Sequence, residues 1–248
     1  MDTPEKPYVL VIAATSDIGK ALAHEYARHG YNLHLTARNQ SLLQVTAEDI
    51  RIRYGVEVTS HRFDVLEFET HEAFYRQLSP APKGVICVAG YLGNQQLAER
   101  DFAETRRILD TNYTGCVSIL NIAASHLEQA GNGFITGISS VAGERGRQSN
   151  YFYGSSKAAF SAYLSGLRNR LYKSGVHVLT VKPGFVDTKM TEGMETPALL
   201  TSQPDEVAHQ VFRAAKKRQN VLYVKWFWRG IMSVIKNIPE QYFKKLKL

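Results

Sequence analysis

Short apolar runs rich in β-branched residues alternate along the chain with stretches of helical periodicity. The runs lie at 8–13, 31–36, 57–62, 84–88, 133–138, 176–181 and 221–224. Amphipathic stretches separate them near 18–29, 39–54, 67–78, 98–130, 153–174 and 204–218. The run at 85–88 lacks polar alternation, as expected where helices cover both faces of a parallel sheet. We therefore expect a doubly wound α/β fold with a parallel sheet of about seven strands.

The composition suits one domain. The chain has 248 residues, 44% hydrophobic and 21% charged, without repeats or an internal linker. We expect a catalytic domain over 1–224 and a dependent tail over 225–248. Cys87 and Cys116 lie in apolar surroundings without ligand spacing, which predicts reduced buried thiols and no metal site. The apolar run at 9–14 is too short for a signal peptide or a membrane span, so we expect a cytoplasmic location.

The C-terminal end is strongly basic. Residues 213–248 hold ten Lys and Arg and one acid, Glu240, a net +9, whereas the other 212 residues carry a net −2. Taken alone, this charge is compatible with nucleic acid, an acidic protein or anionic lipid.

The tail also predicts an amphipathic helix. Five apolar residues fall within an arc of about 100° on it, with three basic residues opposite. The apolar five are Phe227, Ile231, Val234, Ile235 and Ile238, and the basic three are Lys225, Arg229 and Lys236. This pattern is typical of a peripheral anchor on an anionic membrane surface, here the inner face, so we expect lipid rather than nucleic acid. The same stripe is compatible with packing on the domain or on a partner subunit.

A tight turn follows the first run, and a helix begins after it. Such a turn directs backbone N–H groups and the helix N-terminus at a pyrophosphate. Thr15 and Ser16 can donate hydroxyls to phosphate, and Gly19 lets the helix pack on the sheet. The expected cofactor contacts in this turn are Ala13, Thr15, Ser16, Asp17, Ile18 and Gly19. We interpret Asp17 as the helix N-cap; the alternative is a charge that weakens phosphate binding.

The end of the second run bears on cofactor choice. Ala37-Arg38-Asn39 has no acid for the ribose hydroxyls of NAD(H), whereas Arg38 can pair with a 2′-phosphate. NADP(H) is therefore favoured over NAD(H), although a solvent-exposed arginine at a helix start would look the same. Asp64, just past the third run and beside Val65, is placed to bind the adenine amino group.

The candidate chemistry lies further along the chain. Tyr153 and Lys157, spaced i, i+4 on a predicted helix, share one face, where the ammonium stabilises the phenolate. Ser140 follows the fifth run, and Asn112 lies in a helical stretch. Lys182-Pro183-Gly184-Phe185-Val186-Asp187-Thr188 follows the sixth run. In this combination, from residue 8 to about 210, the chain resembles the short-chain dehydrogenase/reductase family, which has a Rossmann-type fold.

The resemblance implies roles for these residues. Ser140 would hold the carbonyl oxygen, Tyr153 would donate the proton, Lys157 would tune that donor and reach the nicotinamide ribose, and Asn112 would support a proton relay. The remaining implied cofactor contacts are Ala89, Gly90, Pro183, Gly184, Val186 and Thr188. The depleted glycine turn and the segment Cys87-Val88-Ala89-Gly90, where the family has Asn-Asn-Ala-Gly, depart from the pattern and bear on cofactor affinity. We expect an NAD(P)-dependent enzyme that interconverts a ketone and a secondary alcohol as a homo-dimer or homo-tetramer.

A weaker resemblance concerns the substrate. The Ala-Thr-Ser-Asp-Ile-Gly turn and the tryptophan-rich tail are similar to a branch that includes decaprenylphosphoryl-2-keto-ribose reductases. It implies a keto-sugar on a lipid-phosphate carrier, whose anionic group can meet Arg145 and Arg147; solvated loop arginines are the alternative. A soluble reductase of acyl or small-molecule ketones is a second interpretation. A catalytically retired nucleotide-sensing protein is a third, disfavoured by the intact Ser140, Tyr153 and Lys157.

Overall fold

A computed structural model describes residues 6–246, so residues 1–5 and 247–248 of the expected domain and tail lie outside it. Seven parallel strands form one sheet in the order β3-β2-β1-β4-β5-β6-β9. They are β1 (Tyr8–Ile12), β2 (Asn32–Ala37), β3 (Val58–Arg62), β4 (Gly84–Cys87), β5 (Gly133–Ile138), β6 (Val176–Lys182) and β9 (Val221–Tyr223). The predicted doubly wound sheet is confirmed, and each apolar run forms one of its strands.

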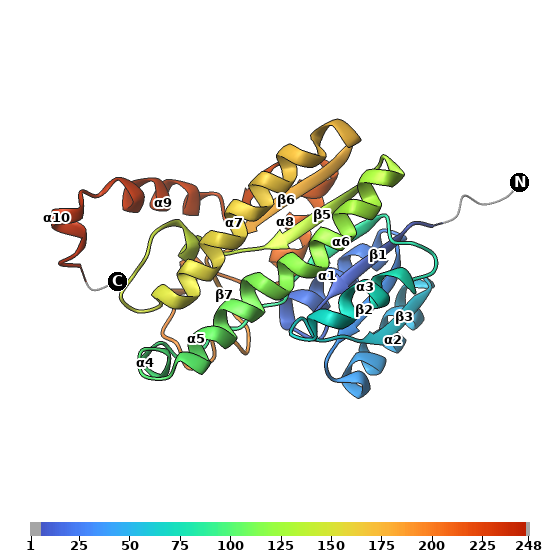
Figure 1. The fold of residues 1–248 in the computed structure, drawn as a ribbon, viewed down its shortest axis with the longest axis horizontal. Coiled ribbons are helices and arrows are strands. Elements are labelled where there is room, and N and C mark those ends of the chain that lie inside the picture. Colours follow the sequence, from blue (N-terminus) through green and yellow to red (C-terminus); the bar gives the residue numbers. More distant parts are fainter. Residues whose placement is uncertain (1–5, 247–248) are drawn as a thin grey trace, which may run out of the picture.

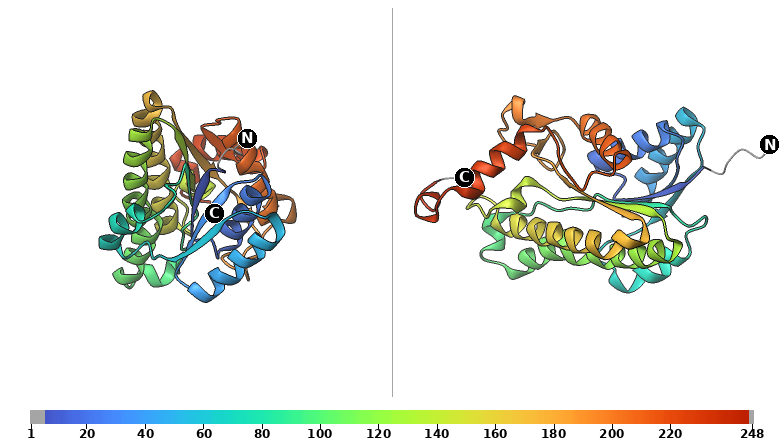
Figure 2. Two further views of the ribbon diagram at one scale, coloured as in Figure 1. Left: turned by 90° about the vertical axis from the view of Figure 1, so that its right-hand side faces the viewer. Right: turned by 90° about the horizontal axis from the view of Figure 1, so that it is seen from above.

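Helices cover both faces of the sheet, as Figures 1 and 2 show. One layer holds α1 (Asp17–Arg28), α2 (Gln40–Tyr54) and α8 (Pro204–Lys216), and the other holds α3 (His71–Arg76), α6 (Gly115–Ala130) and α7 (Tyr151–Leu171). In β1, Val9 and Val11 pack against the first layer, whereas Leu10 and Ile12 pack against the second. Burial on both faces explains the unbroken apolar runs.

The strand order reverses at β1, which pairs with β2 on one side and β4 on the other. In open α/β sheets, a crevice forms at such a switch point, outside the carboxyl ends of the strands. The turn after β1 and the loops after β4, β5 and β6 therefore converge on one edge of the sheet.

The structure corrects two details of the predicted elements. The stretch at 98–130 is not one helix but α4 (Gln95–Ala98), α5 (Phe102–Leu109), the π-helical turn η2 (Asp110–Thr114) and α6. The π turn between α5 and α6 keeps an almost helical periodicity, so the sequence pattern did not reveal that break, whereas α5 begins after its N-cap Asp101. A second sheet of two short strands, β7 (Phe185–Val186) and β8 (Thr201–Ser202), was not predicted. Short 3-10 turns complete the chain: η1 (Phe68–Thr70), η3 (Val141–Glu144), η4 (Tyr172–Ser174) and η5 (Ala198–Leu200).

The tail forms α9 (Phe227–Asn237) and α10 (Glu240–Phe243), which project from the body beyond the carboxyl edge of the sheet (Figures 1 and 2). The buried face of α9 centres on Trp228 and Met232, which pack on Val141. This face is rotated from the predicted apolar arc, because Val234 is exposed. Within residues 6–246, no helix is long and apolar enough to cross a bilayer.

Candidate active site

A cavity of about 410 Å³ opens at the carboxyl edge of the sheet. Its walls come from the turn after β1, the ends of β2 to β6, the start of α7, the loop around β7 and α9. Most residues predicted for the site line it. They are Ala13, Thr15, Ser16, Asp17, Ile18, Arg38, Asp64, Val65, Ala89, Gly90, Ser140, Tyr153, Lys157, Pro183, Gly184, Val186 and Thr188. Gly19 and Asn112 are not among its lining residues and act on it through their neighbours.

Local packing shapes the turn after β1. Ala13 has a φ of 66°, in the left-handed region that favours glycine. Ser16 is the N-cap of α1: its Oγ accepts the N–H of Gly19 at 3.2 Å and donates to the Ala13 carbonyl at 2.7 Å. A Cβ on Gly19 would collide with that carbonyl oxygen and lie 2.7 Å from Ser16 Oγ. The tight turn therefore requires a glycine at position 19.

The interpretation of Asp17 as the N-cap is wrong. Ser16 is already extended and caps the helix, so Asp17 is its first residue. Its carboxylate accepts the backbone N–H of Lys189 at 2.9 Å. Asp17 therefore fastens the turn to the loop after β7.

The residues of this region fit a dinucleotide with a 2′-phosphate. The turn and the N-terminus of α1 face the cavity, as a pyrophosphate requires. Arg38 is exposed, and the structure gives its side chain no hydrogen bond or ion pair to residues 6–246. With Thr15, Asn39 and Gln40, it lines a shallow hollow beside the cavity. Asp64 lines the cavity and accepts the N–H of Leu66 at 3.1 Å.

The helix α7 presents the proposed proton donor and its neighbour. Lys157 is 3% exposed, and its Nζ donates to the Ile138 carbonyl at 3.0 Å, 5.8 Å from the centroid of the Tyr153 ring. Ser140 caps η3, its Oγ accepting the N–H of Ala142 at 3.1 Å. The buried Ser139, which the sequence analysis did not single out, donates to the Lys157 carbonyl at 2.9 Å and so ties α7 to β5. Ser140, Tyr153 and Lys157 consequently line one cavity.

Asn112 lies in the π-helical turn and is fully buried. Its amide nitrogen donates to the carbonyls of Tyr91, at 2.7 Å, and Ile108, at 2.9 Å, and its oxygen accepts the Tyr91 N–H at 2.9 Å. A Cβ on Gly90 would lie 3.3 Å from Asn112 Oδ1 and 3.4 Å from Lys157 Nζ. The side chain of Asn112 therefore fixes the loop after β4 and holds Gly90 against Lys157.

The C-terminal helix supplies a wall of the cavity that the sequence analysis missed. Trp228 is 4% exposed, lines the cavity and packs directly on Gly184. No local pattern reveals this contact, because 43 residues separate the two positions in the sequence. In the sequence analysis, Trp228 was only part of the tryptophan-rich tail.

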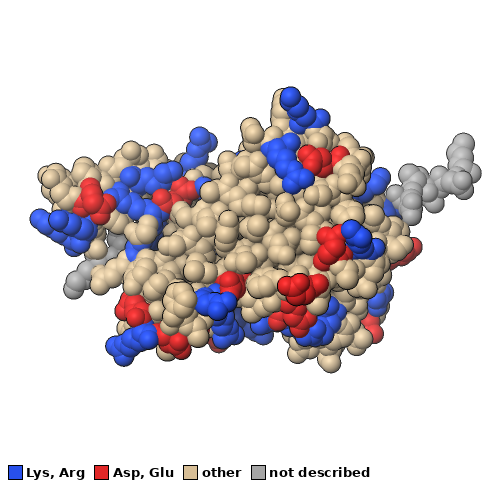
Figure 3. Space-filling model, viewed as in Figure 1, with Lys and Arg blue, Asp and Glu red and all other residues tan. Residues whose placement is uncertain are grey.

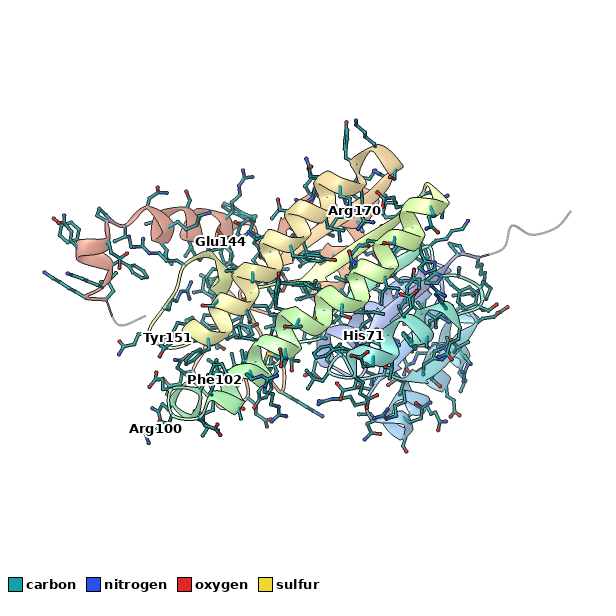
Figure 4. The ribbon with its side chains drawn as sticks, in the orientation of Figure 1. His71, Arg100, Phe102, Glu144, Tyr151 and Arg170 are labelled. Atoms are coloured by element: carbon teal, nitrogen blue, oxygen red, sulfur yellow. The ribbon has the colours of Figure 1, made fainter. Side chains whose placement is uncertain are left out.

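Two neighbouring residues of the η3 region anchor this helix. Glu144, whose side chain is 5% exposed, pairs with Lys182 and, at 2.8 Å, with Lys236 on α9 (Figure 4). Arg145 donates to the carbonyls of Ile235, at 2.8 Å, and Ile238, at 2.6 Å. It also pairs with Glu240 at 2.8 Å and stacks on the Phe243 ring. A cation at a helix C-terminus is favourable, so Arg145 holds α9 and α10 rather than facing the cavity. Of the two loop arginines, only Arg147 lines it.

Comparisons with known proteins agree with this geometry. A family model described as short chain dehydrogenase matches residues 7–198. An uncharacterised oxidoreductase of Mycobacterium tuberculosis is 35% identical, over 99% of this chain and 98% of its own. A sulfoacetaldehyde reductase of Chromohalobacter salexigens is 30% identical, over 74% of each. Among solved structures, a short-chain dehydrogenase of Sphingobium yanoikuyae in complex with NADPH has a TM-score of 0.82 at 24% identity, covering 94% of this chain and 97% of its own. The actinorhodin polyketide ketoreductase with NADPH has a TM-score of 0.81, also at 24%, covering 96% of this chain and all of its own.

Proposed function

Because the chain belongs to the short-chain dehydrogenase family and is an NAD(P)-dependent enzyme that acts on alcohol and carbonyl groups, we propose that it reduces a ketone with NADPH. The observation that carries this proposal is the meeting of Ser140, Tyr153 and Lys157 on the wall of a cavity that also contains the turn after β1. One relative is named as a reductase, which supports the reductive direction.

Ser140, Tyr153 and Lys157 have separate roles at the carbonyl group of the substrate. A bound nicotinamide supplies the hydride. The Ser140 hydroxyl donates a hydrogen bond to the carbonyl oxygen, which gains negative charge in the transition state. The Tyr153 phenol delivers a proton to that oxygen as it becomes an alkoxide. The Lys157 ammonium, held by the Ile138 carbonyl, stabilises the phenolate that remains and binds the nicotinamide ribose.

Other predicted contacts hold the cofactor along the cavity. Its pyrophosphate would lie on the turn from Ala13 to Gly19, and its nicotinamide carboxamide against Pro183, Gly184, Val186 and Thr188. Asp64 and Val65 would bind the adenine, beside Ala89 and Gly90. The exposed Arg38 and the absence of an acid in Ala37-Arg38-Asn39 favour NADPH over NADH.

The lining of the cavity suits a substrate with an apolar portion. It includes Met190 and Met194, both about half-exposed, and Trp228. A keto-sugar on a lipid-phosphate carrier remains our finer proposal, and a soluble acyl or small-molecule ketone is the alternative.

We also propose a homo-dimer or homo-tetramer. The face over α6 and α7 carries few charged side chains at its centre, as Figure 3 shows, and an uncharged surface of this kind suits association. Light scattering on the purified protein gives the mass directly. A monomer at micromolar concentration would contradict this proposal without affecting the proposed chemistry.

A screen of carbonyl compounds tests the function. Purified protein is mixed with NADPH or NADH and with keto-sugars, acyl ketones or aromatic ketones, and nucleotide oxidation is followed together with alcohol formation. We expect reduction of at least one ketone class, faster with NADPH. Binding of NADPH without reduction of any carbonyl would instead indicate a nucleotide-binding protein without catalysis.

A further inference from the structure

Three side chains that line the cavity carry buried polar atoms that no other described residue satisfies. They are Nε of Arg147, Oδ1 of Asn150 and Nε1 of Trp228, which have no hydrogen-bond partner within residues 6–246. All three residues line the cavity. Buried polar groups in native proteins nearly always have partners, so three such atoms around one cavity indicate a polar ligand.

Arg147 supplies the charge. Among residues 6–246, its side chain makes one polar contact, from Nη2 to the sulfur of Met232 at 3.3 Å, and no carboxylate lies within ion-pair distance of it. Burial lowers the pKa of this guanidinium, which nevertheless stays charged. A half-buried cation without a counter-ion is unfavourable unless a ligand provides one. Arg145, two residues earlier, differs from Arg147 because it forms an ion pair with Glu240.

Asn150 lies close in the sequence to the proposed proton donor, Tyr153. Asn150 directly precedes α7, three residues before Tyr153, and its carbonyl accepts the Gly154 N–H at 2.8 Å. The N–H of Asn150 in turn bonds to the Arg147 carbonyl at 3.2 Å. A group bound at Arg147 therefore lies in the same cavity as a carbonyl placed at Tyr153.

Trp228, on the C-terminal helix, is the third of these residues. It is 4% exposed, and its indole N–H is a donor without acceptor capacity. Glu144 and Arg145 hold α9 in place, and the indole nitrogen lies against Gly184 in the loop after β6. The two N–H donors, one of them charged, match the oxygens of an anion rather than a hydrocarbon. The third atom, Asn150 Oδ1, is an acceptor and can take a hydrogen bond only from an N–H or O–H elsewhere on the ligand.

We propose that the substrate is a ketone bearing an oxyanion group (carboxylate, sulfonate or phosphate) and that Arg147 and the indole N–H of Trp228 bind this group. The inference rests on the proposed ketone reduction, and it names the substrate class for that site. The tail is thereby part of substrate recognition, because it supplies one donor and positions Met232 under the guanidinium.

Kinetics with matched ketones test the preference. The ratio of kcat/KM for 4-acetylbenzoate and 4-acetylbenzenesulfonate to that for neutral methyl 4-acetylbenzoate is measured with NADPH. We expect the unmodified enzyme to favour the anions by about 10- to 100-fold, the range for one charge-assisted hydrogen bond. Arg147→Met should bring the ratio toward one, Arg147→Lys should keep part of it, and Trp228→Phe should lower it less. The control is Arg100→Met, an exposed arginine near α4, which should leave the ratio unchanged (Figure 4). An equal loss for both ketone types in Arg147→Met would overturn the proposal.

Binding without turnover separates this inference from the proposed function. Calorimetry on the NADPH complex compares benzenesulfonate with benzenesulfonamide, and thermal unfolding verifies that each variant is folded. We expect the anion to bind more tightly to the unmodified protein and the difference to disappear in Arg147→Met but persist in Arg100→Met. Anion binding without reduction of any ketone would contradict the proposed function alone. Equal affinities of the two probes would refute the anion site even if ketones are reduced.

Discussion

The indole of Trp228 packs so closely on Gly184 that a Cβ at position 184 would overlap its ring atoms. Gly184 belongs to the loop after β6, which is proposed to hold the nicotinamide, and Trp228 belongs to the C-terminal helix. This contact joins the tail to the catalytic domain, together with the anchoring by Glu144 and Arg145. It makes α9 a structural part of the cavity rather than a detached extension.

Gly184→Ala should therefore displace the indole. We expect a loss of about 1–3 kcal/mol in the free energy of unfolding, the usual range for overpacking, and a changed tryptophan emission. Denaturant unfolding followed by fluorescence measures both. The matched control is Gly230→Ala on α9, where a Cβ meets no atom within 4 Å. An equally small effect of both substitutions would show that the indole is free to move.

Removal of the proposed proton donor should reduce catalysis without affecting the fold. Tyr153→Phe is expected to lower kcat by about 10²- to 10⁴-fold, the usual contribution of general acid catalysis, because the developing alkoxide receives no proton. Steady-state kinetics, with NADPH binding as a measure of site integrity, provide the test. Tyr151→Phe on the same helix, whose hydroxyl donates to Glu99 at 3.2 Å, should remain close to the unmodified enzyme (Figure 4). Near-normal turnover in Tyr153→Phe would eliminate the proposed mechanism.

Arg38 should decide the cofactor preference. Its guanidinium is free to pair with a 2′-phosphate, so we expect NADPH to bind about 10- to 100-fold more tightly than NADH. Arg38→Ala should remove most of this difference, whereas Arg76→Ala on the remote helix α3 should preserve it. Fluorescence titration of both nucleotides measures the four affinities. Equal affinities for NADPH and NADH in the unmodified protein would show that Arg38 is an ordinary surface residue without a role in cofactor preference.

Acid should loosen the attachment of α9. Burial alone would raise the pKa of Glu144, but the hydrogen bonds from Lys182 and Lys236 outweigh it and lower this pKa below the ordinary value. A carboxyl with a lowered pKa stabilises the folded state above its unfolded pKa of about 4.3, and this contribution is lost as the pH falls through the folded pKa.

Thermal unfolding between pH 7 and pH 3 follows this loss. Glu144→Gln should cost about 3 kcal/mol at neutral pH, because it leaves Lys182 without its buried partner, and should flatten the acid limb of the curve. Glu72→Gln, which breaks an exposed pair with Arg76, should change little. Identical acid limbs for the Glu144 variant and the unmodified protein would contradict the anchoring role.

Membrane binding by the tail stays a prediction, and substitution of the exposed Trp226 tests it most directly. Phe227, Ile231 and Ile235 pack in the cluster around Trp228, whereas Trp226 is 84% exposed and free to insert. We expect reversible co-sedimentation with anionic liposomes, since each basic residue near such a surface contributes on the order of 1 kcal/mol. Trp226→Ser and high salt should weaken it, whereas Phe102→Ser should not, although Phe102 on α5 is also 70% exposed. A folded protein that ignores anionic liposomes at low salt would leave only the packing role.

The sequence by itself determined the parallel sheet, its seven strands and the order of the chemical groups along it. Hydrophobic periodicity is a local property, and strands buried on both faces must be apolar throughout. The short spacing from Tyr153 to Lys157 likewise fixes a shared helix face without any tertiary information. The turn after β1 was predictable in position, but its cap was placed one residue too late, because Ser16 and Asp17 are both good N-cap residues.

Only the tertiary structure decided which side of the tail is buried and what it covers. Trp228 meets Gly184, and Arg145 meets Ile238, across gaps of 43 and 92 residues, and no local periodicity encodes such partners. Arg145 and Arg147 look alike in the sequence. They differ because Glu240 and the end of α9 satisfy Arg145, whereas Arg147 faces the cavity with no carboxylate among residues 6–246 in reach. The role of a charged side chain depends on the partners that folding brings to it, and these come from distant parts of the chain.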